Sequence, residues 1–179
     1  MHGYLLDSNI VRYWFDAKCP EHERVVQRTQ QLPAGTPLVV SAITLGEIEY
    51  GLRVQDKGAE FEAELVGFIH EQLPMVLSVT ATTRIDYGSI RARLFKKFAP
   101  GELRRKLRLP EQLVDPVRGL ALGIQENDLW IAAQTVEHNL VLVSNDRLTH
   151  LREVAPELRV ENWAGANHGG AASSSASPS

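Results

Sequence analysis

Short apolar runs alternate with longer segments of helical periodicity along most of this 179-residue chain. The strand-like runs cover 4–6, 37–41, 75–79, 140–143 and 158–160, and the helix-like segments cover 8–15, 21–32, 42–53, 57–72, 80–98 and 126–138. Strands that alternate with helices favour a parallel sheet with helices on both faces. We therefore expect an α/β protein with three α/β/α layers and a central, mostly parallel sheet of four to five strands.

The composition is that of one ordinary globular domain, with 44% apolar and 23% charged residues. We assign residues 1–163 to this domain. Pro, Gly and charged residues interrupt the alternation at about 99–122, which predicts an inserted loop or a short helical excursion. Residues 164–179 are small and polar, and we expect a disordered tail because they cannot supply a core.

Charge and cysteine content exclude several classes of protein. The formal net charge of -3 gives no overall basic field, so a polyanionic partner would need a local basic patch or metal ions. The single Cys19 excludes an internal disulfide and leaves too few thiols for a Cys-based zinc site. We see no signal peptide and no apolar run of membrane-spanning length, and we expect a cytoplasmic protein.

Four carboxylates lie close to the ends of the predicted strands. Asp7 directly follows the first strand, Glu47 lies in the first two turns of the helix after the second, and Asp146 follows the fourth. Because neighbouring parallel strands end at one edge of a sheet, we expect these three to lie near one another. Asp128 begins the helix before the fourth strand, and the sequence leaves open whether that helix starts at the same edge.

Each carboxylate also has a purely structural interpretation. Asp7, Asp128 and Asp146 stand where helices begin, and an aspartate cap stabilises a helix by about 1 kcal/mol. Glu47 follows Thr44 by three residues, which matches a capping box. As a group, however, carboxylates about 4 Å apart repel by about 4 kcal/mol per pair, so a converged cluster requires protonation or a cation. Ligands that are all carboxylates suit Mg²⁺ or Mn²⁺.

Four sequence motifs carry a resemblance to a known family: LLDSNI, TLGEIEYGL, ENDLWIAAQ and LVSND. In order and spacing they resemble the four motifs of PIN-domain nucleases, particularly the VapC-type toxins, over about residues 3–163. The resemblance implies a PIN-like fold and an Mg²⁺- or Mn²⁺-dependent endoribonuclease. It gives catalytic, metal-binding roles to the four matching carboxylates, Asp7, Glu47, Asp128 and Asp146.

The resemblance also implies a mechanism and partners. RNA would be hydrolysed by a metal-activated water, leaving 5′-phosphate and 3′-hydroxyl ends. We expect Asp7 and Asp128 to be the main ligands, Glu47 to complete the shell, and Asp146 to bind a second ion or orient water. Ser8 and Asn9 match the polar pair after the first aspartate, beside metal and substrate. A cognate antitoxin is the implied protein partner, and a homodimer is allowed.

The insertion departs from the family pattern and is basic. Eight of the 19 Lys and Arg residues fall between positions 91 and 108, opposed only by Glu102. We select Arg104, Arg105 and Lys106 as substrate-binding residues, because such a patch could hold RNA phosphates. The alternatives are a solvated helix face with a charged loop, or a surface for an antitoxin helix.

Two other functional classes remain open. A non-catalytic PIN-like module could bind RNA or protein, although the presence of all four carboxylates opposes this. An aspartyl-phosphate phosphatase also places an aspartate after its first strand. That enzyme needs a second aspartate two positions later as general acid, and Asn9 stands there instead.

Overall fold

A five-stranded parallel sheet forms the centre of the molecule, in the order β3-β2-β1-β4-β5. The computed structural model describes residues 3–55, 58–99, 101–102 and 106–165. The strands are β1 (Tyr4–Leu6), β2 (Leu38–Ser41), β3 (Met75–Leu77), β4 (Val141–Val143) and β5 (Val160–Glu161). Every pairing is parallel, and β1 lies between β2 and β4. The expected fold class is confirmed.

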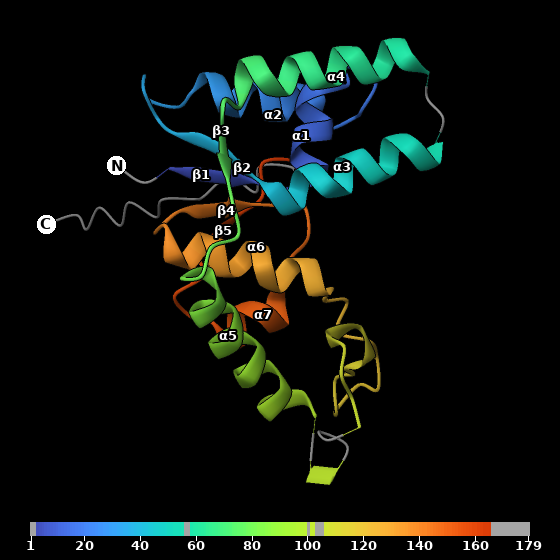
Figure 1. The fold of residues 1–179 in the computed structure, drawn as a ribbon, viewed down its shortest axis with the longest axis vertical. Coiled ribbons are helices and arrows are strands. Elements are labelled where there is room, and N and C mark those ends of the chain that lie inside the picture. Colours follow the sequence, from blue (N-terminus) through green and yellow to red (C-terminus); the bar gives the residue numbers. More distant parts are fainter. Residues whose placement is uncertain (1–2, 56–57, 100, 103–105, 166–179) are drawn as a thin grey trace, which may run out of the picture.

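Helices cover both faces of the sheet, which gives the three layers seen in Figure 1. One layer contains α1 (Ser8–Phe15), α2 (His22–Gln30), α3 (Ala42–Gln55) and α4 (Ala59–Gln72). The other contains α5 (Thr83–Phe98), α6 (Glu126–Glu137) and α7 (Thr149–Val154). Each helical connection as a whole returns the chain to the amino end of the next strand, as parallel pairing requires.

Alternation along β1 divides the apolar residues between two cores. Successive side chains of a strand point to opposite faces, so Leu5 packs with α5, α6 and α7, and Leu6 packs with α1, α2 and α4. Both leucines are fully buried. Burial of such a side chain stabilises the fold by about 1.5–3 kcal/mol, so β1 is fixed in position from both sides.

A buried polar side chain joins α6 to two strands. Gln134 is completely buried, its Oε1 accepts a hydrogen bond from Ser41 Oγ, and its Nε2 donates to the carbonyl of Leu77 at 3.2 Å. Buried polar groups are stable only when they are paired. Gln134 therefore holds the ends of β2 and β3 at a fixed distance from α6.

Two local features differ from the sequence prediction. The sequence predicted a helix start near Asp146 but no range for α7, since six residues are too few to show a clear period. The edge strand occupies Val160–Glu161, shifted from the predicted 158–160.

The insertion packs against the body of the protein. It contains the 3-10 turn η2 (Pro110–Gln112) and an antiparallel bridge between Val114 and Ala121. Leu113 and Leu122 are buried in the core beneath α5 and α6. Figure 1 shows the insertion between the end of α5 and the start of α6. The described part of the insertion is thus a loop that contains one short 3-10 turn and is anchored by apolar side chains.

Two predictions concern the ends of the domain. The predicted tail falls almost entirely on residues 166–179, which lie outside the described residues, and the domain boundary at residue 163 stays a prediction.

Within the described ranges, none of the helices combines the length and apolar character that spanning a lipid bilayer requires.

Candidate functional site

Asp7 lies at the carboxyl end of the central strand, and its side chain is buried. Its backbone N–H donates to Val143 O at 3.0 Å, which holds it beside β4. Its Oδ1 accepts from Ser8 N at 2.8 Å, while its Oδ2 accepts from Ser144 Oγ at 2.7 Å and from Asn9 Nδ2 at 3.2 Å. The cap interpretation of Asp7 is confirmed, and it is compatible with a second role.

The surroundings of Asp7 disfavour its negative charge. Burial raises the pKa of the Asp7 carboxyl above its usual value, and the nearby charges of Glu47 and Asp146 raise it further. The hydrogen bonds from Ser144 and from Ser8 N lower the pKa, but they do not offset the effect of burial. A cation beside Asp7 would stabilise the ionised form of its carboxyl group.

Asp128 faces the same edge, which the sequence had left open. Helix α6 starts at the carboxyl ends of the strands, and Asp128 Oδ2 accepts from Gln125 N at 2.7 Å in its first turn. Burial raises the pKa of Asp128 to about 6, and the charges of Asp7, Glu47 and Asp146 add to that rise. Asp128 is therefore both part of a helix cap and a neighbour of the other three carboxylates.

Glu47 reaches the site from the second turn of α3. Its Oε1 accepts a hydrogen bond from Asn127 Nδ2 at 2.8 Å, which links α3 to the start of α6. The capping-box interpretation of Glu47 is wrong, because Ser41 Oγ caps this helix by accepting from Ile43 N at 3.0 Å. The Thr44 hydroxyl is buried and has no hydrogen-bond partner among the described residues.

Asp146 lies in the exposed loop after β4. Its backbone N–H donates to Ser144 Oγ at 3.1 Å, and its Oδ2 lies 3.5 Å from Asn9 Nδ2. The helix cap predicted for Asp146 is wrong, because Leu148 stands at the N-cap position of α7. Asp146 is thus held at the edge of the acidic site and is the most exposed of its four carboxylates.

Two uncharged residues of this site escaped the sequence prediction. Ser144 is completely buried and joins the Asp7 side chain to the Asp146 backbone, while Asn127 holds Glu47. Both residues lie inside motifs that were recognised by their carboxylates. Polar residues next to the acidic positions of a motif were the only signal that could have indicated them.

The donor set fits a hard divalent cation. All four ionisable groups are carboxylates, which Mg²⁺ and Mn²⁺ prefer. The raised pKa values of Asp7 and Asp128 indicate negative charge that the protein leaves uncompensated. Within the described ranges, no three His, Cys, Asp or Glu side chains already converge on one point, so metal binding requires side-chain rotations at this edge.

Much of the basic charge near the insertion is neutralised within the chain. Three ion pairs join α5 to acidic residues elsewhere: Arg91 with Glu126, Arg93 with Glu157, and Lys97 with Glu153. These pairs favour the solvated-face interpretation for α5. Arg104 and Arg105 lie outside the described residues, and Lys106 is exposed. Their substrate-binding roles stay predictions.

The fold and this acidic edge define a family. A family model described as PIN domain matches residues 4–155. The chain therefore belongs to the PIN domain family, as the four motifs indicated.

Named relatives within that family agree with the match. The chain is 30% identical over 165 residues to ribonuclease VapC2 of Haemophilus influenzae, covering 91% of this chain and 99% of the relative. It is 26% identical over 160 residues to ribonuclease VapC2 of Rickettsia felis, covering 89% and 97%. The resemblance to VapC-type proteins is confirmed.

Solved structures show the same fold. DNA-bound VapBC from Salmonella typhimurium aligns with a TM-score of 0.55 at 28% identity, covering 91% of this chain and 99% of that one. VapBC2 from Rickettsia felis, bound to a DNA fragment from its promoter, aligns with a TM-score of 0.65 at 24% identity, covering 89% and 98%.

The phosphatase alternative loses its remaining support. Asn9 donates its amide to Asp7 and accepts from Asn145 N at 3.1 Å, so it acts as a link between α1 and the loop after β4. An amide carries no acidic proton to give a leaving group.

Proposed function

We propose that this chain is an Mg²⁺- or Mn²⁺-dependent endoribonuclease and the toxin of a toxin–antitoxin pair. The observation that carries the proposal is the meeting of Asp7, Glu47, Asp128 and Asp146 at one edge of the sheet, where nearby carboxylates help to raise the pKa values of Asp7 and Asp128. Helix caps alone would not require four carboxylates from four separate segments to lie within reach of one another.

Each carboxylate has an assigned task in the proposal. Asp7 and Asp128 are the main metal ligands, because Asp7 is buried, Asp128 is half-buried, and the pKa values of both are raised. Glu47 completes the ligand set, with its carboxylate oriented by Asn127. Asp146, which is exposed, serves a second ion or orients water.

The chain's own side chains prepare the site for this chemistry. A bound divalent cation supplies a lowered water pKa and polarises the scissile phosphate. Ser144 and Asn9 donate to Asp7 and thereby fix the direction of its free lone pairs. Such supporting hydrogen bonds tune metal affinity in many sites. No side chain is needed as nucleophile.

The toxin role rests on relatives. Two of them are named ribonuclease VapC2, and the similar solved structures are VapBC complexes. We therefore propose RNA as substrate and a cognate antitoxin as protein partner.

The test is cleavage of structured and single-stranded RNAs with Mg²⁺, with Mn²⁺ and with excess EDTA. Wild type is expected to cleave only with a divalent ion, and Asp7→Asn is expected to lose the activity. Product ends should be 5′-phosphate and 3′-hydroxyl. The matched control is Asp86→Asn on α5, outside the acidic site, which should cleave like wild type.

Two outcomes would contradict the proposal. One is cleavage that persists in EDTA or in a folded Asp7→Asn variant. The other is a folded wild type that cuts none of the RNAs tested. The latter would favour the non-catalytic module that binds RNA or protein.

A further inference from the structure

We propose that a pocket beside the acidic edge binds one unstacked nucleobase of the RNA substrate, next to the scissile phosphate. This inference rests on the proposed ribonuclease function and adds a base-binding subsite to it.

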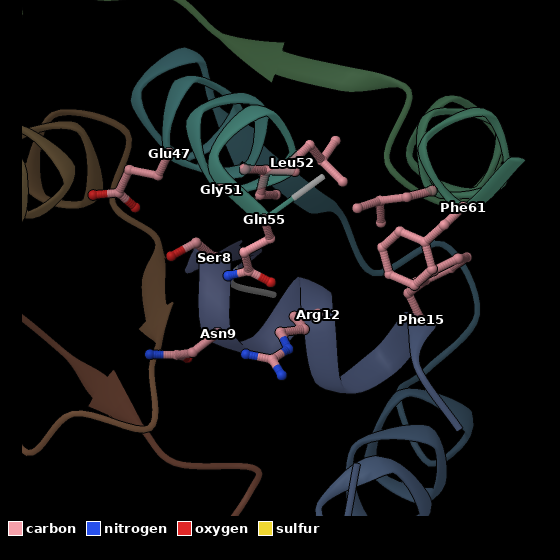
Figure 2. A pocket seen from close by; sticks show the side chains of 11 residues that line it. Ser8, Asn9, Arg12, Phe15, Glu47, Gly51, Leu52, Gln55 and Phe61 are labelled. Atoms are coloured by element: carbon pink, nitrogen blue, oxygen red, sulfur yellow. The ribbon is translucent and has the colours of Figure 1, made fainter. Parts of the chain in front are cut away.

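The pocket has a volume of about 300 Å³ and lies between α1, α3 and α4. Figure 2 shows Ser8, Asn9 and Glu47 at one side and Phe15 and Phe61 at the other. Three of its lining residues, Ser8, Asn9 and Glu47, thus also belong to the acidic edge or adjoin it. An RNA strand bound across the carboxylates would pass the mouth of this pocket.

The size and lining suit a planar heterocycle. A volume of about 300 Å³ is at the lower end of small-molecule sites, which rules out a large occupant. The inner wall is apolar, formed by Ile48, Leu52 and Leu65 together with the two phenylalanines. Protein sites for single-stranded RNA commonly hold splayed bases against aromatic rings or arginine planes.

Polar groups stand where a nucleotide would need them. Arg12 and Gln55 line the pocket between its acidic and aromatic sides in Figure 2. Gln55 offers an amide donor and acceptor for the edge of a base. Within the described part of the chain, Arg12 forms no ion pair with an acidic side chain, so its charge is available for a phosphate.

The charge pattern favours RNA over an apolar protein segment. A phosphate bound by Arg12 would lie between the proposed metal ligands and the aromatic side of the pocket, and its base would extend toward Phe15 and Phe61. One nucleotide can make both contacts at once, because its charge and its apolar ring are directly linked.

One of the residues that line the pocket is a glycine, and a larger side chain at that position would fill the pocket. Gly51 lines it, and an added Cβ there meets no heavy atom within 4 Å. Gly67 on α4 has equally open space and does not line the pocket. Since both lie within helices, replacement by phenylalanine removes a helix-destabilising glycine in each case. Gly51→Phe and Gly67→Phe are therefore a matched pair.

The experiment uses six-nucleotide single-stranded RNAs with 2-aminopurine placed at each position in turn, titrated with protein in Ca²⁺. At one position, binding to wild type and Gly67→Phe should change the emission, and Gly51→Phe should abolish that change. In Mg²⁺, Gly51→Phe should lower kcat/KM for RNA by about tenfold, the loss expected for one stacked base. Gln55→Glu, which adds a negative charge without changing helix geometry, should act in the same direction.

The possible outcomes distinguish the base-binding proposal from the ribonuclease proposal on which it rests. A wild type that cleaves RNA, with Gly51→Phe equally active and equally responsive in emission, overturns the base site alone. A Gly51→Phe variant could keep RNA cleavage and the emission change but lose binding to the cognate antitoxin. That result would make the pocket a protein-docking site and would also overturn the base-binding proposal. Absence of cleavage by wild type contradicts the ribonuclease, while the emission measurement still decides the base site.

Discussion

Ser144 donates its hydroxyl proton to Asp7, with 2.7 Å between Ser144 Oγ and Asp7 Oδ2, and both side chains are buried. The same Oγ accepts from the Asp146 backbone N–H. One hydroxyl thus connects two carboxylate residues from opposite ends of the sequence.

We expect Ser144→Ala to weaken metal binding. Loss of the hydrogen bond removes an interaction that lowers the pKa of Asp7 and leaves its carboxylate held only by Ser8 N and Asn9. Supporting residues of this kind change metal affinity by about 10- to 100-fold. Titration calorimetry with Mn²⁺ should show that loss, and Ser144→Thr, which keeps the hydroxyl, should bind more tightly than Ser144→Ala. Equal affinities for all three proteins would refute the role of Ser144.

The pKa of Asp128 predicts how stability depends on pH in EDTA. The folded-state pKa, about 6, is above the ordinary aspartate pKa of 3.8, so the folded protein binds this proton more tightly than the unfolded chain. The corresponding stabilisation is present below pH 4 and is lost as the pH rises to about 6. We therefore expect wild type to lose stability relative to Asp128→Asn between pH 4 and 7.

Thermal melts of both proteins from pH 4 to 7.5 measure this difference. Mg²⁺ at pH 7 should raise the melting temperature of wild type and have little effect on Asp128→Asn, because a bound cation offsets the repulsion. A difference between the two proteins that does not vary with pH would contradict the assigned pKa shift.

Arg12 and Lys97 should affect RNA binding differently. Lys97 pairs with Glu153 at 2.7 Å, whereas Arg12 has no such partner among the described residues. Arg12→Gln is expected to weaken binding of single-stranded RNA and to reduce the slope of log K against log salt by about 0.7, the value for one phosphate contact. Lys97→Gln should leave that slope nearly unchanged. Anisotropy titrations at four salt concentrations give both slopes, and equal effects would mean that ion pairing does not select the phosphate-binding residue.

Gln134 offers a test of the fold that does not involve the site's carboxylates. Gln134→Leu removes the acceptor of Ser41 and the donor to the Leu77 carbonyl, all in a buried region. Leaving buried polar groups unpaired costs about 1–3 kcal/mol each, so we expect a loss of about that size in the free energy of unfolding. Urea denaturation measures it. Gln30→Leu, at an exposed position of α2, is the control. Its free energy of unfolding should differ from that of wild type by no more than about 0.5 kcal/mol.

The sequence predicted the layers and the sheet because its strands are short, apolar and separated by helices of clear period. Leu5 and Leu6 illustrate the reason. A strand that is buried on both faces has a continuous apolar sequence, which is easily recognised as a strand. The range of α7 was not predicted, because a helix of six residues contains fewer than two turns. The start of α1 at Ser8 was predicted, and the Asp7 side chain caps the helix there.

The sequence predicted the carboxylates of the candidate site but not the uncharged residues that form hydrogen bonds with them. Asp7 and Asp128 were identifiable because a charged residue at a strand or helix end is conspicuous in a sequence. Ser144 and Asn127 act through hydrogen bonds that exist only after distant segments meet, so no local pattern marks them. The caps proposed for Glu47 and Asp146 failed for the same reason, since the helix starts depend on Ser41 and Leu148.

The placement of β1 between β2 and β4 has a consequence for how such a protein is made. The first strand of the chain gains its neighbour β4 only after Val141–Val143 has been synthesised. A nascent chain stopped before that strand contains Asp7, Glu47 and Asp128 but not Ser144 or Asp146. Under the proposed function, we therefore expect RNA cleavage to require nearly complete synthesis of the domain.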